Sequence, residues 1–323
     1  MRGGTAASDA LRSRAFDVAV GAALLLMPMW MGAIGGYTEL ASRIVVMGLA
    51  AMSLNFLLGF TGVLSFGHAA YFGLGAYGAA MAIKYLGAGT IPAIGLGVLV
   101  ATLAAMIVGG LIVRRRGVYF AMVTIAFGQV FYFLAFRWNS VTGGDDGLTG
   151  WRRLPIDFGF AKLDIAGGDT AFYYFALAIF AVCVGAMAAL IASPFGRSLI
   201  AIRENERRAR FLGLPIEFHI WLSFVISCLF VSVAGALYAL LNNFTDPRAL
   251  RWDLSGNLVI MAVLGGMRSF WGPLIGAAIF VALQDYVSSH TANWMSAIGL
   301  VFVLVVRFFP RGILGMLRKS VKA

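Results

Sequence analysis

Charged residues are scarce in this sequence. Asp, Glu, Lys and Arg make up 12% of its 323 residues, whereas 61% of the residues are hydrophobic. Soluble domains carry about 25% charged residues. There are only 8 prolines, and the 40 glycines follow no Gly-X-Y period, which excludes a collagen-like fibre. Because most of its surface must face a solvent other than water, we predict an integral membrane protein and exclude a soluble globular one.

Several kinds of chemistry lack their motifs. No Gly-Lys dipeptide occurs, so there is no P-loop, and we predict that the chain is not an enzyme and does not itself hydrolyse ATP. Cys183 and Cys228 lie in apolar runs and are predicted to pack without forming a disulfide. The three histidines are scattered and predict no metal site. A GxGxxG match at 73–78 lies in an apolar run, where close helix contacts explain it better than a dinucleotide site.

Long continuous apolar runs dominate what is present, and they favour helical spans over the short alternating strands of a barrel. We find ten runs: 15–34, 41–58, 68–86, 91–113, 117–137, 170–192, 217–241, 255–266, 272–289 and 293–309. The predicted fold is an all-α polytopic membrane protein with about ten transmembrane helices. Because only Gly59–Gly67 separates the second and third runs, a broken or re-entrant passage is possible there. The number of spans falls to eight if two runs are half-helices.

The net charge of +11 is unevenly distributed along the chain. If the N-terminus is cytoplasmic, most Lys and Arg residues fall on the cytoplasmic side, as the positive-inside rule requires. We therefore predict a cytoplasmic N-terminal segment at 1–14, a transmembrane domain at 15–309 and a cytoplasmic tail at 310–323. This orientation, with membrane lipid as a partner, accounts for the charge without nucleic acid.

Two connecting segments are longer than a turn. The outer one, 138–169, is predicted to be periplasmic and has room for a short helix. The inner one, 193–215, predicts an amphipathic helix because four apolar residues share one stripe: Leu199, Ile202, Ala209 and Leu212. Gly213 and Pro215 would end it. The pairs Arg203/Arg207 and Glu204/Arg208 would form one charged surface, facing either anionic lipid or a groove on a cytoplasmic partner.

Four polar side chains gather at membrane depth between residues 54 and 77: Asn55, Thr61, Ser65 and His68. They lie around Gly59, Gly62, Gly67 and Gly73. In hydrocarbon such groups persist only where they are buried in protein or line a wet cavity. One interpretation is a helix break that lines a solute path, with Gly62 in the break. The other is a tight helix crossing. Gln129, in a later run, either lines the same path or makes an interhelical hydrogen bond.

Seven segments follow one another along the chain: GFTGVLSFGHAAYFGLGAY, RRRGVYFAMVTIAFGQ, TGGDDGL, SPFGRSLIAIRENERRARFLGL, GALYAL, MAVLGGMRSFWGPLIGAA and RFFPRGILG. Together, over about residues 40–317, they resemble the LivM-type permeases of branched-chain amino acid ABC importers. Asp145 replaces the serine of the usual TGGSDGL-like run, and Phe66 departs from a SLGHAA-like run. Both departures bear on the choice of solute, because related urea and short-chain amide permeases look similar.

The resemblance implies a permease subunit in the bacterial inner membrane that translocates branched-chain or related amino acids. It implies three kinds of partner: a homologous LivH-type permease, two cytoplasmic ATPases that use ATP and Mg, and a periplasmic solute-binding protein. This chain itself would bind no cofactor. Segment 193–215 corresponds to the coupling loop, with these predicted coupling residues: Gly196, Arg197, Arg203, Glu204, Asn205, Glu206, Arg207 and Gly213. The outer loop of the family corresponds to Thr142, Gly143, Gly144, Asp145 and Asp146.

Two other classes of function stay open. An ion-coupled secondary transporter would need a relay of buried carboxylates, for which Asp285 is a single candidate. An intramembrane enzyme would use Ser65 and His68, which are three residues apart, but nothing else in the sequence builds an activated nucleophile.

Overall fold

In a computed structural model of the chain, the described residues are 16–33, 36–157, 162–163 and 167–291, with short pieces between 295 and 314. The predicted span 293–309 and the predicted segments 1–14 and 310–323 lie wholly or largely outside these residues. Within the described residues, five helical segments are long and apolar enough to cross a membrane: α3 (Thr38–Asn55) with its continuation η1 (Phe56–Thr61), α5 (Thr90–Ile112), α6 (Val118–Arg137), α8 (Asp169–Ala192) and α11 (Ile216–Asn242).

The remaining elements are shorter or less apolar. They are a helix over Phe16–Leu25, α2 (Met27–Ala33), α4 (His68–Leu86), α7 (Asn139–Thr142), η2 (Gly144–Asp146), α9 (Pro194–Glu204), α10 (Glu206–Phe211), η3 (Pro247–Leu250), α12 (Trp252–Gly265) and α13 (Gly272–Ser288). The first predicted run holds two helices because the chain turns at Leu26. In the described part, one hairpin departs from the all-α prediction: β1 (Ile156–Asp157) pairs antiparallel with β2 (Lys162–Leu163).

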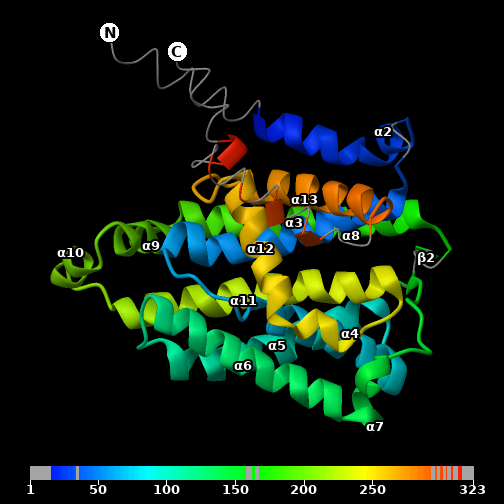
Figure 1. Cartoon of the computed structure of the whole chain (residues 1–323), viewed down its shortest axis with the longest axis horizontal. Coiled ribbons are helices and arrows are strands. Elements are labelled where there is room, and N and C mark those ends of the chain that lie inside the picture. Colours follow the sequence, from blue (N-terminus) through cyan, green and yellow to red (C-terminus); the bar gives the residue numbers. More distant parts are fainter. Residues whose placement is uncertain are drawn as a thin grey trace.

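The helices form layers that run along the long axis of the molecule (Figure 1). The N-terminal helices cover the layer of α3, α8 and α13. Beneath it lie α4 and α11, and then α5 and α6. The short helix α12 crosses between the layers and contacts α13, α3 and α4. The helices α9 and α10 project at one end of the body, and α7 and β2 lie at the other.

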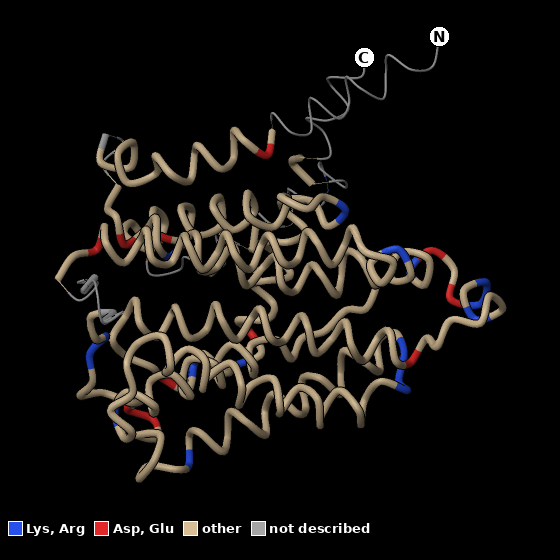
Figure 2. The backbone as a smooth tube through the Cα atoms, turned by 180° about the vertical axis from the view of Figure 1, so that it is seen from behind, with Lys and Arg blue, Asp and Glu red and all other residues tan. Residues whose placement is uncertain are grey.

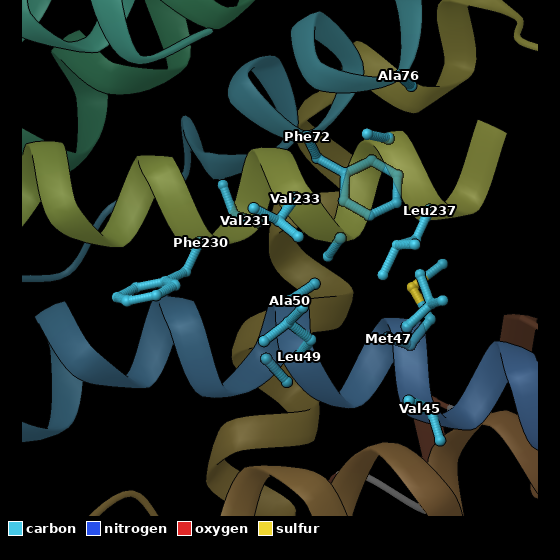
Figure 3. Packing of buried hydrophobic residues seen from close by; sticks show 14 of the residues in the cluster. Val45, Met47, Leu49, Ala50, Phe72, Ala76, Phe230, Val231, Val233 and Leu237 are labelled. Carbon is cyan, nitrogen blue, oxygen red and sulfur yellow. The ribbon is translucent and has the colours of Figure 1, made fainter. Parts of the chain in front are cut away.

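The centre of the core is the contact of α3, α4 and α11. Figure 3 shows apolar side chains of α3 and α11 facing one another, with Phe72 and Ala76 of α4 beside them. Glycines let these helices approach closely: a Cβ at Gly75 would meet the backbone of Ser232, and a Cβ at Gly235 would meet the backbone of Phe72. The prediction that the GxGxxG match serves helix packing is therefore confirmed.

Charged residues lie mostly at the two ends of the helical body (Figure 2). The end with α9 and α10 carries Arg114–Arg116 and the charged residues of segment 193–215. Long helices with charges confined to their ends have the form of spans whose ends reach water on either side.

Candidate functional site: a helix break facing the coupling loop

The predicted break between the second and third apolar runs is present. The chain leaves α3 through the π-helix η1, passes Gly62 in a left-handed conformation (φ 78°), and starts α4 only at His68. Glycine suits position 62 because residues with a Cβ rarely adopt such a φ. Residues 62–67 are therefore non-helical between two apolar helices.

His68 lies at the centre of a buried hydrogen-bonded cluster. Its Nδ1 is 3.0 Å from Ser65 Oγ and its Nε2 is 2.8 Å from Ser227 Oγ, which itself donates to the carbonyl of Ser53. The hydroxyl of Ser227 donates its hydrogen to the carbonyl of Ser53 and can only accept from His68. The imidazole hydrogen must therefore be on Nε2, and Nδ1 must accept a hydrogen bond from Ser65. The side chain is fully buried. His68 and Ser227 thus join α3, α4 and α11, and both His68 and Ser65 are buried.

Asn55 and Thr61 carry buried polar atoms that lack a partner within the described part of the chain: Asn55 Oδ1 and Thr61 Oγ1. The amide nitrogen of Asn55 donates to the carbonyl of Ser269 at 3.4 Å, which connects the end of α3 to the loop between α12 and α13. Gln129 is half-buried on α6, and among the described residues no hydrogen bond joins it to the other predicted path residues.

Segment 193–215 forms two helices, so the prediction of one continuous amphipathic helix is wrong. The chain becomes extended at Asn205 (φ −159°), whose side-chain oxygen accepts from the backbone N–H of Arg208 at 2.9 Å. Asparagine competes with a helical backbone in this way, and it starts α10 as an N-cap. The two members of each predicted charge pair therefore lie on different helices. Arg203 and Glu204 are on α9, and Arg207 and Arg208 are on α10. Leu199, Ile202 and Ala209 are buried as predicted, whereas Leu212 is 74% exposed.

The other predicted coupling residues have varied surroundings. Gly196 packs so closely on Ile191 that a Cβ would meet its backbone, and Gly213 adopts a left-handed conformation (φ 81°) just after α10. Exposed side chains are found at Arg197, Glu204, Asn205 and Arg207.

Four charged side chains hold α10 against its neighbours. Glu206 Oε1 is 3.3 Å from both Arg116 and Arg210, while Glu217 Oε1 is 2.9 Å from Arg210 and 3.7 Å from Arg116. The hydrogen bond to Glu217 is the main reason why the pKa of Arg210 is raised. The sequence indicated Arg114–Arg116 only as a stop for a span. The role of Arg116 depends on residues 90 positions or more away, so sequence spacing could not reveal it.

The helix break and the predicted coupling loop, segment 193–215, meet at one cavity of about 600 Å³. Thr61, Gly62 and Phe66 line it from the break, Val118 and Met122 from α6, and the segment Ile202–Glu206 from the loop. Arg203 spans the gap, since its Nη1 donates to the carbonyl of Gly59. Two predicted path residues, Thr61 and Gly62, are thus brought together with the predicted coupling residues 203–206. The other predicted path residues lie away from the cavity lining: Asn55, Ser65, His68 and Gln129.

The predicted outer loop is held by the side chain of Thr142 at its start and by a β-bridge from Leu148 to Thr245. The Thr142 hydroxyl donates to the carbonyls of Ala135 and Trp138, and Gly143 and Gly144 take left-handed conformations that lead into η2. Asp145 and Asp146 are exposed beside a hollow of about 410 Å³. The short helix that the sequence allows in this loop is present as α7.

The outer end also contains a buried arginine that the sequence did not single out. Arg153 is 7% exposed, its guanidinium lies 4.7 Å from the ring centroid of Phe172, and it pairs with Asp169 at 3.6 Å. It ties the outer loop to the start of α8.

A family model described as "Branched-chain amino acid transport system / permease component" matches residues 36–306. The "High-affinity branched-chain amino acid transport system permease protein LivM" of Salmonella typhimurium is 28% identical over 306 residues, which cover 89% of this chain and 72% of that protein. The corresponding LivH protein of that organism is 32% identical over 127 residues, 38% of this chain and 40% of its own length.

Among solved structures, "PsaBC from Streptococcus pneumoniae in complex with Fab" aligns over 84% of this chain and 90% of that chain. Its sequence identity is 18% and its TM-score is 0.43, a likeness too weak to support an argument about the fold.

Proposed function

We infer the function of this chain from the family to which it belongs, the permease components of branched-chain amino acid transport systems. It is a multi-pass membrane protein of that family. We propose that it is the membrane subunit of an ATP-driven ABC importer in the bacterial inner membrane, with about ten spans and both termini in the cytoplasm. The solute is a branched-chain or related amino acid. Urea and short-chain amides are the alternatives within this class.

The proposed complex contains a second, LivH-type permease, two cytoplasmic ATPases that use ATP and Mg, and a periplasmic solute-binding protein. ATP binding closes the ATPase pair and displaces the coupling loops, so that the permease turns from inward- to outward-facing and receives solute from the binding protein. In the outer loop, Asp145 and Asp146 are proposed to face that protein, and their exposure supports the assignment.

One observation carries the proposal. Segment 193–215, which the family resemblance relates to coupling, and the helix break, for which a solute path is one of two interpretations, line the same cavity. A loop that contacts a break in a span is in the right place to move it. We propose that Thr61 and Gly62 line the cytoplasmic part of the solute path. For Asn55, Ser65 and His68 the proposed role is narrower: their burial supports a role in shaping the break and not in contacting solute.

The position of Asp285, the single candidate for a carboxylate relay, does not favour an ion-coupled transporter. Asp285 Oδ1 accepts a hydrogen bond from the hydroxyl of Tyr37 at 2.7 Å, near the outer ends of α3 and α13. Tyr37 directly precedes α3, whereas the cavity is lined by Thr61 at the opposite end of the continuous helix of α3 and η1. A proton or sodium relay along the path would need acids between these points.

The test is uptake of radiolabelled leucine into proteoliposomes that hold the chain with its permease partner, ATPases and binding protein. We expect uptake that requires ATP and the binding protein, and that Glu204→Arg or Arg207→Glu abolishes it while the protein still inserts. Lys84→Glu, a charge reversal at an exposed residue of the opposite end, is the control and should keep uptake.

Other outcomes would exclude the proposal. Uptake by the chain alone under an ion gradient without ATP would establish the secondary-transporter alternative. Competition by urea or acetamide but not by valine would move the solute to the amide class. Normal uptake in both loop variants would show that this loop does not dock on the ATPases.

A further inference from the structure

We propose that Arg203 is a positioning residue that links the coupling loop to the helix break by holding the carbonyl of Gly59. The inference rests on the proposed function, because it concerns how movement of α9 reaches the solute path. It changes the role of Arg203 from a contact with the ATPase to an internal connection.

The carbonyl of Gly59 is free to accept because of the way η1 ends. In an α-helix the N–H of Val63 would donate to Gly59, but here it donates to Leu57, and the N–H of Gly62 donates to Leu58. The last carbonyls of a helix need other partners, and a cation is favoured there by the helix dipole. Arg203 supplies both the hydrogen bond and the charge, since its Nη1 donates to this carbonyl.

The glycine at position 62 makes room for the arginine. A Cβ built on Gly62 would lie 2.7 Å from Arg203 Cγ, closer than carbon atoms pack. The aliphatic part of Arg203 therefore crosses directly over the left-handed turn that ends η1. A substitution at Gly62 can disturb the link without removing any charge, which gives an independent way to test it.

The other side of Gly59 faces a second break. A Cβ on Gly59 would meet the carbonyl of Met267 and the side chain of Asn55, whose amide donates to Ser269. Met267 and Ser269 belong to the loop that joins α12 to α13. A displacement of the Gly59 carbonyl by Arg203 would therefore act on two non-helical segments at once. They are residues 62–67 and the loop between α12 and α13, and both contact the end of η1.

Arg203 differs in this respect from other predicted coupling residues. Arg197 and Arg207 are exposed on α9 and α10, where an ATPase can reach them, whereas Arg203 is half-buried and lines the cavity beneath the loop. Docking residues should govern assembly and hydrolysis. A linking residue should instead govern how much transport each hydrolysed ATP produces.

The experiment measures leucine uptake and ATP hydrolysis in the same proteoliposomes, with the complete complex and after its assembly has been verified by gel filtration. We expect Arg203→Ala to raise the ATP consumed per leucine about 10-fold, a typical size for coupling between sites. Hydrolysis itself should stay near wild type. Arg203→Lys should raise the ratio less, because an ammonium can still reach one carbonyl. Gly62→Ala should raise it as well. Arg114→Ala, an exposed arginine outside the loop, is the matched control.

A parallel fall in uptake and hydrolysis would overturn the proposal and make Arg203 a docking contact, and so would a wild-type ratio in Arg203→Ala. If Arg203→Ala does not assemble, Arg203→Lys decides: a raised ratio supports the link and an unchanged ratio overturns it. Failure of the proposed function is distinguishable, because the wild-type complex would then show no ATP-dependent uptake at all.

Discussion

The helices α11 and α6 are both long and apolar, yet they occupy opposite kinds of position. In their most apolar stretches 83% of α11 is buried against 28% of α6, while α3 resembles α11 at 89%. Apolar character does not separate them. Buried serines do, because α3 and α11 carry Ser42, Ser53, Ser223, Ser227 and Ser232, whereas α6 has no serine. Between helices in lipid, small and polar residues drive contact, so they mark the centre of this protein.

The largest expected effect comes from putting bulk into the centre. Gly235→Leu would drive α11 off the backbone of Phe72 in α4. We expect a loss of about 3 kcal/mol or more, since overpacking cannot relax against backbone. The matched change in a peripheral helix is Gly185→Leu in α8, where a Cβ meets nothing within 4 Å. Thermal unfolding in detergent, followed by fluorescence-detected gel filtration, should separate the two. Equal stability of the pair would remove the distinction between centre and periphery.

A middle-sized effect is expected at the polar cluster of the centre. His68→Ala leaves the Ser65 hydroxyl without its acceptor and removes the donor to Ser227, which should cost about 1–3 kcal/mol. Because the two partners share one bond, His68→Ala with Ser227→Ala should cost less than the sum of the single changes. Unfolding midpoints of the four proteins in the cycle measure this. Strict additivity would show that the contact is not energetically coupled.

The smallest effect is expected at Tyr37, which directly precedes the central helix α3. The hydrogen bond to Asp285, together with burial, raises the pKa of Tyr37 to about 12. A tyrosine whose pKa is raised on folding stabilises the protein below its unfolded pKa of about 10, and that contribution is lost as the pH rises through about 12. Since Tyr37 is 47% exposed, solvent screening limits the effect. We expect Tyr37→Phe to cost about 0.5 kcal/mol.

That cost should be constant between about pH 7 and pH 9.5, below both pKa values. The control is Tyr286→Phe, at the residue that follows Asp285 in the sequence. Because the side chain of Tyr286 is 67% exposed, this change should leave the free energy of unfolding unchanged. A cost that disappears already by about pH 9 would mean that the hydroxyl of Tyr37 ionises earlier than its bond to Asp285 allows.

The sequence predicted the features that depend on local pattern. The break at Gly59–Gly67 could be found because polar and glycine residues interrupt apolar runs that would otherwise continue. The described parts of the runs at 68–86 and 91–113 begin and end within a residue of α4 and α5. In these places the periodicity and the breaks lie within one stretch of chain, so no knowledge of distant residues is needed.

Features that depend on competition or on distant contacts were missed. The break at Asn205 lies in a segment whose apolar pattern predicts one continuous helix. Only the capping bond from the backbone of Arg208 to Asn205 shows that a new helix begins there. The link from Arg203 to Gly59 joins residues 144 positions apart. Likewise, the close contact at Gly235 could not be predicted, because its partner, the backbone of Phe72, is on another helix.

The shortness of α12 has a consequence for how the chain is made. With 14 residues it extends about 21 Å, well short of the ~30 Å of hydrocarbon that an independently inserted span must cover. With 17 residues, α13 extends about 26 Å. The helix α12 therefore lacks the length to cross the hydrocarbon alone, and α13 is at the lower limit for a span. We expect the two helices to insert together as a hairpin and to pack against α3 and α4, which precede them in the chain.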